Sequence, residues 1–380
     1  MSMVKEKTYL ERVSEFHKIY ANEIRPILAV HEKTRKRLFV LEILAILLIP
    51  LSVLIFLFVS MDGLNLFMSY VEDSVYIWIY IICPLTFIVS CIIAATIPNS
   101  FTQNLKTECL PRVLKVFPNM TWETKVHSIS DSELERSALF ASYNRRQSDD
   151  NFSATYKGVD FKICETAMTY ESGSGKNKHV ENIFDGVVIT FSANKDIKNR
   201  TMIATKGDKT AKSTGFYLVG FVMWIALKCL DIYFENPVCY FTIVGILTAV
   251  ALIFYLLMKN VKNGEALDEV KLEDPKFAKR FNVYSSDQVE ARYLVTPSFM
   301  ERFQNLNTAF GAKKAKCSFY DNKIMFAIST NKNLFEVGSI WHSLEDPKSI
   351  NQLFNELYSV YQIIDYFKLD QKLGYKPIIK

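Results

Sequence analysis

One apolar stretch constrains what this chain can fold into more than any other feature of its sequence. Residues 38–60 read LFVLEILAILLIPLSVLIFLFVS and carry a single charged residue, Glu42. A helix rises ~1.5 Å per residue, so about 20 such residues cross the ~30 Å hydrocarbon layer of a bilayer. The stretch is longer than the apolar core of a cleavable signal, and a charge-rich segment precedes it. It therefore predicts a membrane-spanning helix that is retained as an anchor.

Three further apolar runs occupy residues 75–97, 215–230 and 238–258. Short connections at 61–74 and 231–237 join the four runs into two helical hairpins. The segment 1–37 carries nine Lys and Arg, whereas both connections carry acids and neither Lys nor Arg. Because positively charged flanks stay on the cytoplasmic side, both termini and the soluble segments are expected in the cytoplasm. The sequence thus predicts a multi-pass α-helical anchor of four spans.

The soluble segment that follows the first hairpin shows helix and strand patterns. A capping box of Ser130 and Glu133 predicts a short helix that begins near Asp131. Apolar residues then alternate in three places: Phe152, Ala154 and Tyr156; Phe161 and Ile163; Val187, Ile189 and Phe191. This period of two is typical of half-buried antiparallel strands.

The last soluble segment contains three helix starts and one hairpin. Acceptor side chains precede proline at Asp274-Pro275, Thr296-Pro297 and Asp346-Pro347. Asp and Thr accept hydrogen bonds from first-turn amides, and Pro tolerates the next position, so each pair predicts a helix start. The stretch 314–329 predicts a hairpin that turns at Asp321-Asn322, and apolar residues from Ile350 to Ile364 recur at helical spacing. The expected class is α+β, with antiparallel strands and a long C-terminal helix.

The decapeptide YESGSGKNKH at 170–179 resembles a phosphate-binding loop in its glycines and lysine. Such a loop needs Gly, four residues and Gly-Lys-Ser/Thr, and it runs from a strand into a helix. Here Tyr170 takes the first glycine position, Asn177 takes the hydroxyl position, and no helix pattern follows. We expect a hairpin loop between a strand ending near Tyr170 and one beginning near Ile183. Lys176 and Lys178 are then solvated, or alternatively meet anionic lipid headgroups.

Residue types that carry chemistry are scattered. The five histidines are His17, His31, His127, His179 and His342, and neither they nor the seven cysteines show metal-ligand spacing. Asp287 and Glu290 could act as a catalytic pair, but strand alternation would place them on opposite faces, and Arg292 is a salt-bridge partner for Glu290. We therefore predict no catalytic, cofactor-binding or metal-binding residues, no cofactor and no disulfide.

The stretch FNVYSSDQVEARYLVTPSFMERF at 281–303, with LEDPKF just upstream, resembles a bacterial membrane family, the domain of unknown function DUF3137. The resemblance extends less clearly through 184–208 and the closing helix. It implies an amino-terminal membrane hairpin carrying a cytoplasmic domain, hence a bacterial inner membrane location, and it supplies no activity or site residues. The second hairpin departs from the family pattern and looks like an insertion.

Five segments follow from these patterns. They are a cytoplasmic, amphipathic and basic N-terminal helix (1–37), a first transmembrane hairpin (38–97), the first half of a cytoplasmic α+β domain (98–213), an inserted transmembrane hairpin (214–259) and the second half of that domain with the C-terminal helix (260–380). The N-terminal helix has an apolar side made of Leu10, Val13, Phe16, Tyr20, Ile24 and Ile27. This side is expected to contact a partner or the chain's own domain.

These features favour a non-enzymatic binding, scaffolding or sensing module. Its expected partners are the lipid bilayer and an unknown protein or a second copy of the chain, with no nucleic acid. An oligomeric transporter or channel component for a small solute or lipid is the alternative. A transport pathway needs polar groups near the middle of the membrane, whereas the residues deep in the predicted spans are Pro50 and Pro84, which more often give a packed kink than a pathway. Glu42 and Lys228 lie near span ends and are expected to snorkel to an interface. An enzyme acting at the membrane is the third hypothesis.

Overall fold

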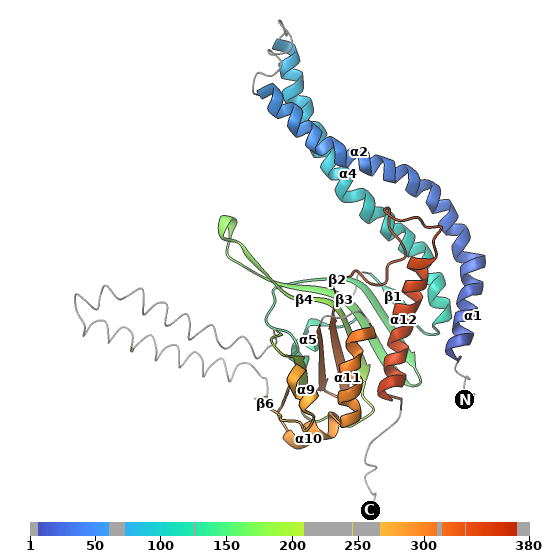
Figure 1. The fold of residues 1–380 in the computed structure, drawn as a ribbon, viewed down its shortest axis with the longest axis vertical. Coiled ribbons are helices and arrows are strands. Elements are labelled where there is room, and N and C mark those ends of the chain that lie inside the picture. The colour runs from blue at the N-terminus through green and yellow to red at the C-terminus, as the bar shows by residue number, and fades with distance from the viewer. Residues whose placement is uncertain are drawn as a thin grey trace, which may run out of the picture. The chain divides into compact units, whose positions relative to one another are not determined.

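A computed structural model describes residues 7–60, 73–124, 127–208, 245, 267–309, 314–330 and 332–370. Apart from Gly245, the second predicted hairpin at 214–259 lies outside the described residues. The chain divides into two compact units (Figure 1). The helical unit comprises Met1–Pro118 and Leu334–Tyr358, and the sheet unit comprises Asn119–Asn333 and Ser359–Lys380.

The helical unit contains two long helical stretches. Its elements are α1 (Tyr9–Ile19), a π-helical turn η1 (Tyr20–Ile24), α2 (Arg25–Ser60), α4 (Asp73–Val113), a 3-10 turn η2 (Leu114–Val116) and the first part of α12 (Lys348–Phe367). A capping box of Thr8 and Glu11 starts α1. The stretches Tyr9–Ser60 and Trp78–Val116 are long and apolar enough to cross a membrane. Within this unit α2 packs along α4, the blue and cyan pair in Figure 1.

The amphipathic N-terminal helix buries only part of the predicted apolar side. Phe16 stacks on Phe354 of α12 with ring centroids 4.5 Å apart, whereas Leu10 is 76% exposed. Arg12 is buried instead, and its guanidinium donates to the carbonyl of Val116 at 2.9 Å. The expected stripe is therefore partly wrong, because the helix turns the side of Arg12 and Phe16 inward.

Glu42 is also placed differently from the expectation. It was expected to snorkel to an interface, but it is only 2% exposed. The buried residues of α2 around it, Ala45, Ser52 and Val59, recur every seven residues, which is the spacing of a helix seam. The snorkelling prediction is wrong because Glu42 lies on this inward-facing side of the helix. Its Oε2 has no hydrogen-bond partner among the described residues.

The sheet unit is built on one antiparallel sheet. Its strands are β1 (Thr121–Glu123), β2 (Arg145–Tyr156), β3 (Val159–Ser172), β4 (His179–Ser192), β5 (Thr201–Thr205), β6 (Asp268–Glu269), β7 (Phe281–Ser285), β8 (Lys314–Tyr320) and β9 (Lys323–Ser329). Their spatial order is β1-β2-β3-β4-β9-β8-β5-β7-β6, and every pairing is antiparallel. Since β5 pairs with both β7 and β8, strands from either side of residues 209–266 join one sheet.

Both faces of the central strands are buried. On one face Phe161, Phe191 and Phe326 pack together, with ring centroids about 6 Å apart. On the other face the short helix α5 (Asp131–Ser137) and the residues after it cover a second core that includes Val188 and Met325. The expectation of a half-buried strand is therefore wrong for β4, because other parts of the chain cover both of its faces.

Three helices of the sheet unit begin where the sequence predicts: α5, α9 (Pro275–Arg280) and α11 (Pro297–Ala309). The helix α10 (Gln288–Leu294) was not predicted, because the sequence pattern placed Asp287 and Glu290 in a strand. The last part of α12 also belongs to this unit. Asp274 accepts hydrogen bonds from two first-turn amides of α9, and Thr296 accepts one from Phe299. The mixed α+β class with an antiparallel sheet and a C-terminal helix is confirmed.

Both predicted hairpin turns are confirmed. Asp321 and Asn322 have φ of +47° and +55°, as a two-residue turn between β8 and β9 requires. The decapeptide joins β3 to β4, although these strands run further than predicted and pair as far as Ser172 and His179. Gly173 is fixed by its geometry, because a Cβ there would lie 2.3 Å from the carbonyl oxygen of Asn177.

Candidate ligand pocket

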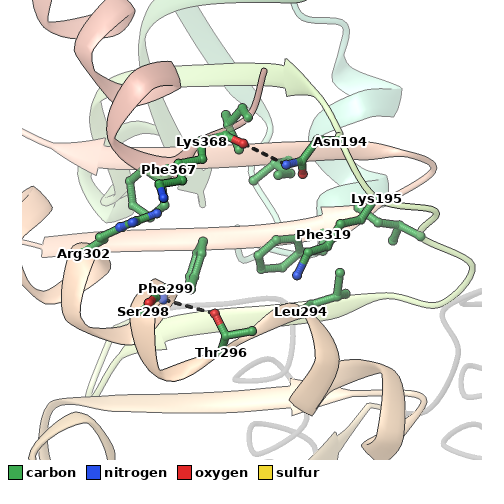
Figure 2. Close-up of a pocket in the computed structure, with 13 residues that line it drawn as sticks. Asn194, Lys195, Leu294, Thr296, Ser298, Phe299, Arg302, Phe319, Phe367 and Lys368 are labelled. Carbon is green, nitrogen blue, oxygen red and sulfur yellow. Dashed lines mark hydrogen bonds between the residues drawn. The ribbon is translucent and has the colours of Figure 1, made fainter. Parts of the chain in front are cut away.

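The sheet unit contains a cavity of about 380 Å³ that four parts of the chain enclose (Figure 2). The segment after β4 contributes Asn194, Lys195 and Ile197; the end of α10, the link after it and the first turns of α11 contribute Leu294, Thr296, Ser298, Phe299 and Arg302; the β8–β9 hairpin contributes Phe319 and Ile324; and the end of α12 contributes Phe367, Lys368 and Leu369. Its size lies near the lower end of the ~300–1,000 Å³ that is typical of ligand pockets.

Glu290 fixes the segment that forms one wall of this cavity. Its carboxylate accepts the backbone N–H groups of Lys198 at 2.8 Å and Asn199 at 3.0 Å, and the side-chain amide of Asn199 at 2.6 Å. The predicted salt bridge with Arg292 is wrong, because Arg292 instead donates to the carbonyl of Gln288. Glu290 therefore ties the segment after β4 to α10.

Asp287 likewise has a structural role that the sequence pattern missed. It precedes a helix rather than lying in a strand, and its carboxylate accepts the amides of Val289 and Glu290 at the start of α10. Asp287 thus caps the start of α10, whereas Glu290 binds amides of the segment after β4. The structure does not bring the two carboxylates together as a catalytic pair.

Two other side-chain amides complete the pocket frame. Asn194 donates to the backbone carbonyl of Lys368 at 2.9 Å, a bond drawn in Figure 2. Asn322, in the β8–β9 turn, accepts the amide of Ile197 at 2.8 Å. The wall after β4 is therefore held at three points, by α10, by the β8–β9 turn and by the end of α12.

Aromatic side chains make the floor of the pocket. The ring of Phe299 lies 5.2 Å from that of Phe319 and 5.1 Å from that of Phe367, measured between centroids. These distances are typical of favourable aromatic contacts. Leu294 and Ile324 extend the apolar surface. The floor is therefore preformed by residues of the helices and the sheet together.

The charged residues that line the pocket are all cationic, namely Lys195, Arg302 and Lys368. Figure 2 shows Arg302 and Lys195 on opposite sides of the cavity, with Phe299 and Phe319 between them. The Lys195 ammonium donates to the carbonyl of Tyr293 at 2.9 Å and lies 4.4 Å from its ring centroid, and burial lowers the pKa of Lys195. None of the described lining residues is acidic. The pocket therefore combines an apolar floor with positive charge.

A second, more open hollow of about 570 Å³ lies elsewhere in the sheet unit. Both lysines in its lining pair with an acid: Glu133 contacts Lys323 and, at 3.9 Å, Lys162. Asp321, also in its lining, pairs with Arg136 at 3.0 Å. The charges of this hollow are thus mutually neutralised, which distinguishes it from the cavity in Figure 2.

The other residues singled out from the sequence lie apart from the pocket. In the decapeptide loop Lys178 pairs with Glu171 at 3.1 Å. His31 contacts Glu108 at 3.2 Å, and His342 shares a hydrogen bond with Ser339 at 3.0 Å. Sequence reasoning did not identify the pocket. The helix start at Thr296-Pro297 was the one part of the pocket that the local sequence predicted. The other walls come from elements that are distant in the sequence.

Part of the chain matches a known protein family. Residues 182–369 match a family model described as a protein of unknown function (DUF3137), which agrees with the resemblance at 281–303. All of the residues that line the pocket fall within this range. No curated protein and no solved structure matches the chain.

Proposed function

We propose that this chain, which belongs to the DUF3137 family through residues 182–369, is a membrane-anchored, non-enzymatic binding or sensing module whose sheet unit holds a small ligand. The observation that supports this best is the cavity of about 380 Å³ with an aromatic floor and cationic polar groups. It needs no cofactor and no nucleic acid in this role. A protein partner or a second copy of the chain would bind preferentially to the ligand-bound state.

The anchoring part of the proposal rests on the helical unit. Large apolar side chains are exposed along 40–58 of α2 and 78–92 of α4, which suits lipid contact better than water. Together with the two later apolar runs, these helices support a proposal of four spans, and the basic flanks favour a cytoplasmic location of both termini and the sheet unit in a bacterial cell. The membrane is then the inner one.

Thiol labelling tests this topology. Single cysteines at Leu64 and Glu235, in the two short connections, should react with a membrane-impermeant reagent added to intact cells. A cysteine at Lys314, at the start of β8, should react only after the cells are opened. Labelling at Lys314 in intact cells would contradict the proposed orientation.

A pocket-filling variant tests ligand binding. Ser298 lines the cavity, so Ser298→Trp should fill it and abolish binding of small amphiphiles measured by ligand-detected NMR on the full chain in lipid nanodiscs. Val289→Trp is the matched control, because Val289 lies on the neighbouring helix α10 and is 76% exposed. Equal signals from Ser298→Trp and the unaltered protein would refute a ligand site here.

Glu42 favours a second candidate function, an oligomeric transporter or channel component. Ionisable residues buried at membrane depth commonly mark ion or proton pathways, and Glu42 is buried with Oε2 unpaired among the described residues. Proteoliposomes that contain a pH-sensitive dye would test it under an imposed potential. Proton entry that exceeds that of protein-free vesicles and disappears in Glu42→Gln would support transport, and equal leak in all three samples would exclude it.

A further inference from the structure

The size of the cavity limits what it can hold. About 380 Å³ is near the small end of known ligand pockets, so the occupant is compact, not a two-chain lipid. Because Phe299, Phe319 and Phe367 form the floor, most of the ligand surface must be apolar. A fully hydrophilic ion or sugar would leave this aromatic surface without a partner.

The charge of the cavity defines the polar end of the ligand. Arg302 and Lys195 both face it, and no acid lines it among the described residues (Figure 2). Asp196, Glu301 and Asp370 adjoin lining residues in the sequence, but they do not line the cavity themselves. The carboxylate of Glu290, which ties one wall in place, accepts backbone amides. An anionic group is therefore favoured over a cationic one.

The first turns of α11 offer the better place for that anion. Ser298 and Arg302 are four residues apart on this helix, so they lie on one face, and both line the cavity. The amino end of this 13-residue helix adds a partial positive charge. Its first residue, Pro297, has no N–H and the amide of Phe299 donates to Thr296, so the backbone contribution there is the N–H of Ser298. Lys195 already donates to the carbonyl of Tyr293, whereas the Arg302 guanidinium lies 5.6 Å from the ring centroid of Tyr366, a contact that involves no hydrogen-bond acceptor. Arg302 is thus the cation best placed to bind a planar carboxylate with two parallel hydrogen bonds.

We propose that this pocket recognises a compact amphiphilic monocarboxylate, with its carboxylate at Arg302 and Ser298 and its apolar body on Phe299, Phe319 and Phe367. The proposal rests on the proposed function, since it names the ligand class of the same site. Lys195 supplies a second positive charge across the cavity. Two kinds of compound share this chemistry, a medium-chain fatty acid and an aromatic acid.

A matched set of probes separates the charge from the apolar body. Octanoate, octanol and octylammonium share one alkyl chain, and 2-naphthoate replaces the chain by rings. Calorimetric titration of the full chain in nanodiscs, with Ser298→Trp as the reference for partition into lipid, measures binding to the pocket. We expect octanoate to bind at least about tenfold more tightly than octanol, because a charged hydrogen bond adds to burial, and octylammonium to bind least. Tighter binding of 2-naphthoate than of octanoate would identify the aromatic source.

Variants at Arg302 test the assigned contact. Arg302→Gln should weaken octanoate about tenfold or more and leave octanol unchanged, and Arg302→Lys should restore part of the loss. Arg292→Gln is the control: it removes the same charge from the exposed side of α10, outside the pocket lining, and should change neither affinity. Lys195→Gln gives a second, smaller loss for octanoate if Arg302→Gln fails to fold.

The outcomes distinguish this inference from the function on which it rests. If octanoate and octanol bind equally and Arg302→Gln changes neither, while Ser298→Trp abolishes both, the pocket is a ligand site but the carboxylate assignment is wrong. If no probe binds better to the unaltered chain than to Ser298→Trp, the proposed function fails with it.

Discussion

Replacing Glu32 by glutamine should loosen the segment that joins the sheet unit's last strand to α12. Glu32 lies in α2 and is 3% exposed, and its carboxylate accepts the amide of Leu344 at 2.9 Å. Both its oxygens also accept hydrogen bonds from Arg35 at 2.8 Å, and Arg35 in turn donates to the carbonyl of Ile340. The buried pair therefore fastens residues 340–344 to α2 within the helical unit. Glu32→Gln keeps the shape of the side chain and removes its charge.

The pKa of Glu32 gives the magnitude. Hydrogen bonds from Arg35, together with the amide of Leu344, lower it from 4.5 to about 2. At 1.36 kcal/mol per pKa unit, the folded state favours the carboxylate by about 3 kcal/mol. Removing one member of a buried ion pair costs a similar amount, about 3–5 kcal/mol. Opening of residues 340–344 should therefore become about 100-fold more frequent, since every ~1.4 kcal/mol is a factor of ten.

The pH dependence follows from the direction of the pKa change. Because the folded pKa is depressed, this stabilisation is fully present above about pH 4.5 and is lost as the pH falls from there toward about 2. In Glu32→Gln this group no longer titrates, so the additional protection should be absent at every pH. The unaltered protein and the variant should thus converge near pH 2.

Hydrogen exchange with mass spectrometry on the full chain in detergent measures this opening in peptides that cover 340–346. Glu345→Gln is the control, because the Glu345 side chain is 71% exposed and contacts Lys36 only at 3.7 Å. Such an exposed pair contributes about 0–1 kcal/mol, so its loss should change exchange by less than about fivefold. An effect of Glu32→Gln no larger than that of Glu345→Gln would refute the reasoning.

Two further substitutions test the sheet unit. Gly186→Ala should destabilise it by about 2–4 kcal/mol, because the new Cβ would lie 2.2 Å from the carbonyl oxygen of Ile328. Gly158→Ala is the control: a Cβ there meets nothing within 4 Å, so the change should cost only about 1 kcal/mol from the positive φ. Equal melting temperatures of the two variants would contradict this prediction. Glu290→Ala should raise the rate of hydrogen exchange of residues 194–199 by about tenfold or more, since three hydrogen bonds to a charged acceptor are lost. Arg292→Ala should leave this rate unchanged. Similar effects of both substitutions would indicate that Glu290 and Arg292 form a salt bridge after all.

Features that depend on neighbours in the chain were predictable from the sequence alone. The capping box at Ser130, the helix starts at Asp274 and Thr296, and the turn at Asp321-Asn322 all form as expected. Their chemistry is local: an acceptor side chain meets amides two or three residues away, and positive φ suits Asn and Asp. The apolar length of 38–60 likewise requires no partner to be recognised.

Features that depend on distant partners required the tertiary structure. The expectation for Glu290 failed because its carboxylate meets amides 91 and 92 residues away, and nothing at positions 286–294 encodes those partners. Burial of both faces of β4 also depends on helices from other parts of the chain. Alternation of apolar and polar residues along a strand indicates which face is more apolar, and it does not show whether another element covers the second face. The burial of Glu42 also depends on a distant partner. The side of α2 that is buried is determined by how α2 packs on α4.

The pocket shows this division most clearly. The sequence by itself determined that a helix starts at Thr296-Pro297, that β8 and β9 form a hairpin, and that a long helix closes the chain. Their meeting around one cavity, with Phe299, Phe319 and Phe367 as its floor, was decided by the tertiary structure. The physical reason is that each of these phenylalanines occupies a position in its own helix or strand that is typical of an ordinary core residue. Only the arrangement of the elements leaves a space beside the rings and places Arg302 and Lys195 next to that space.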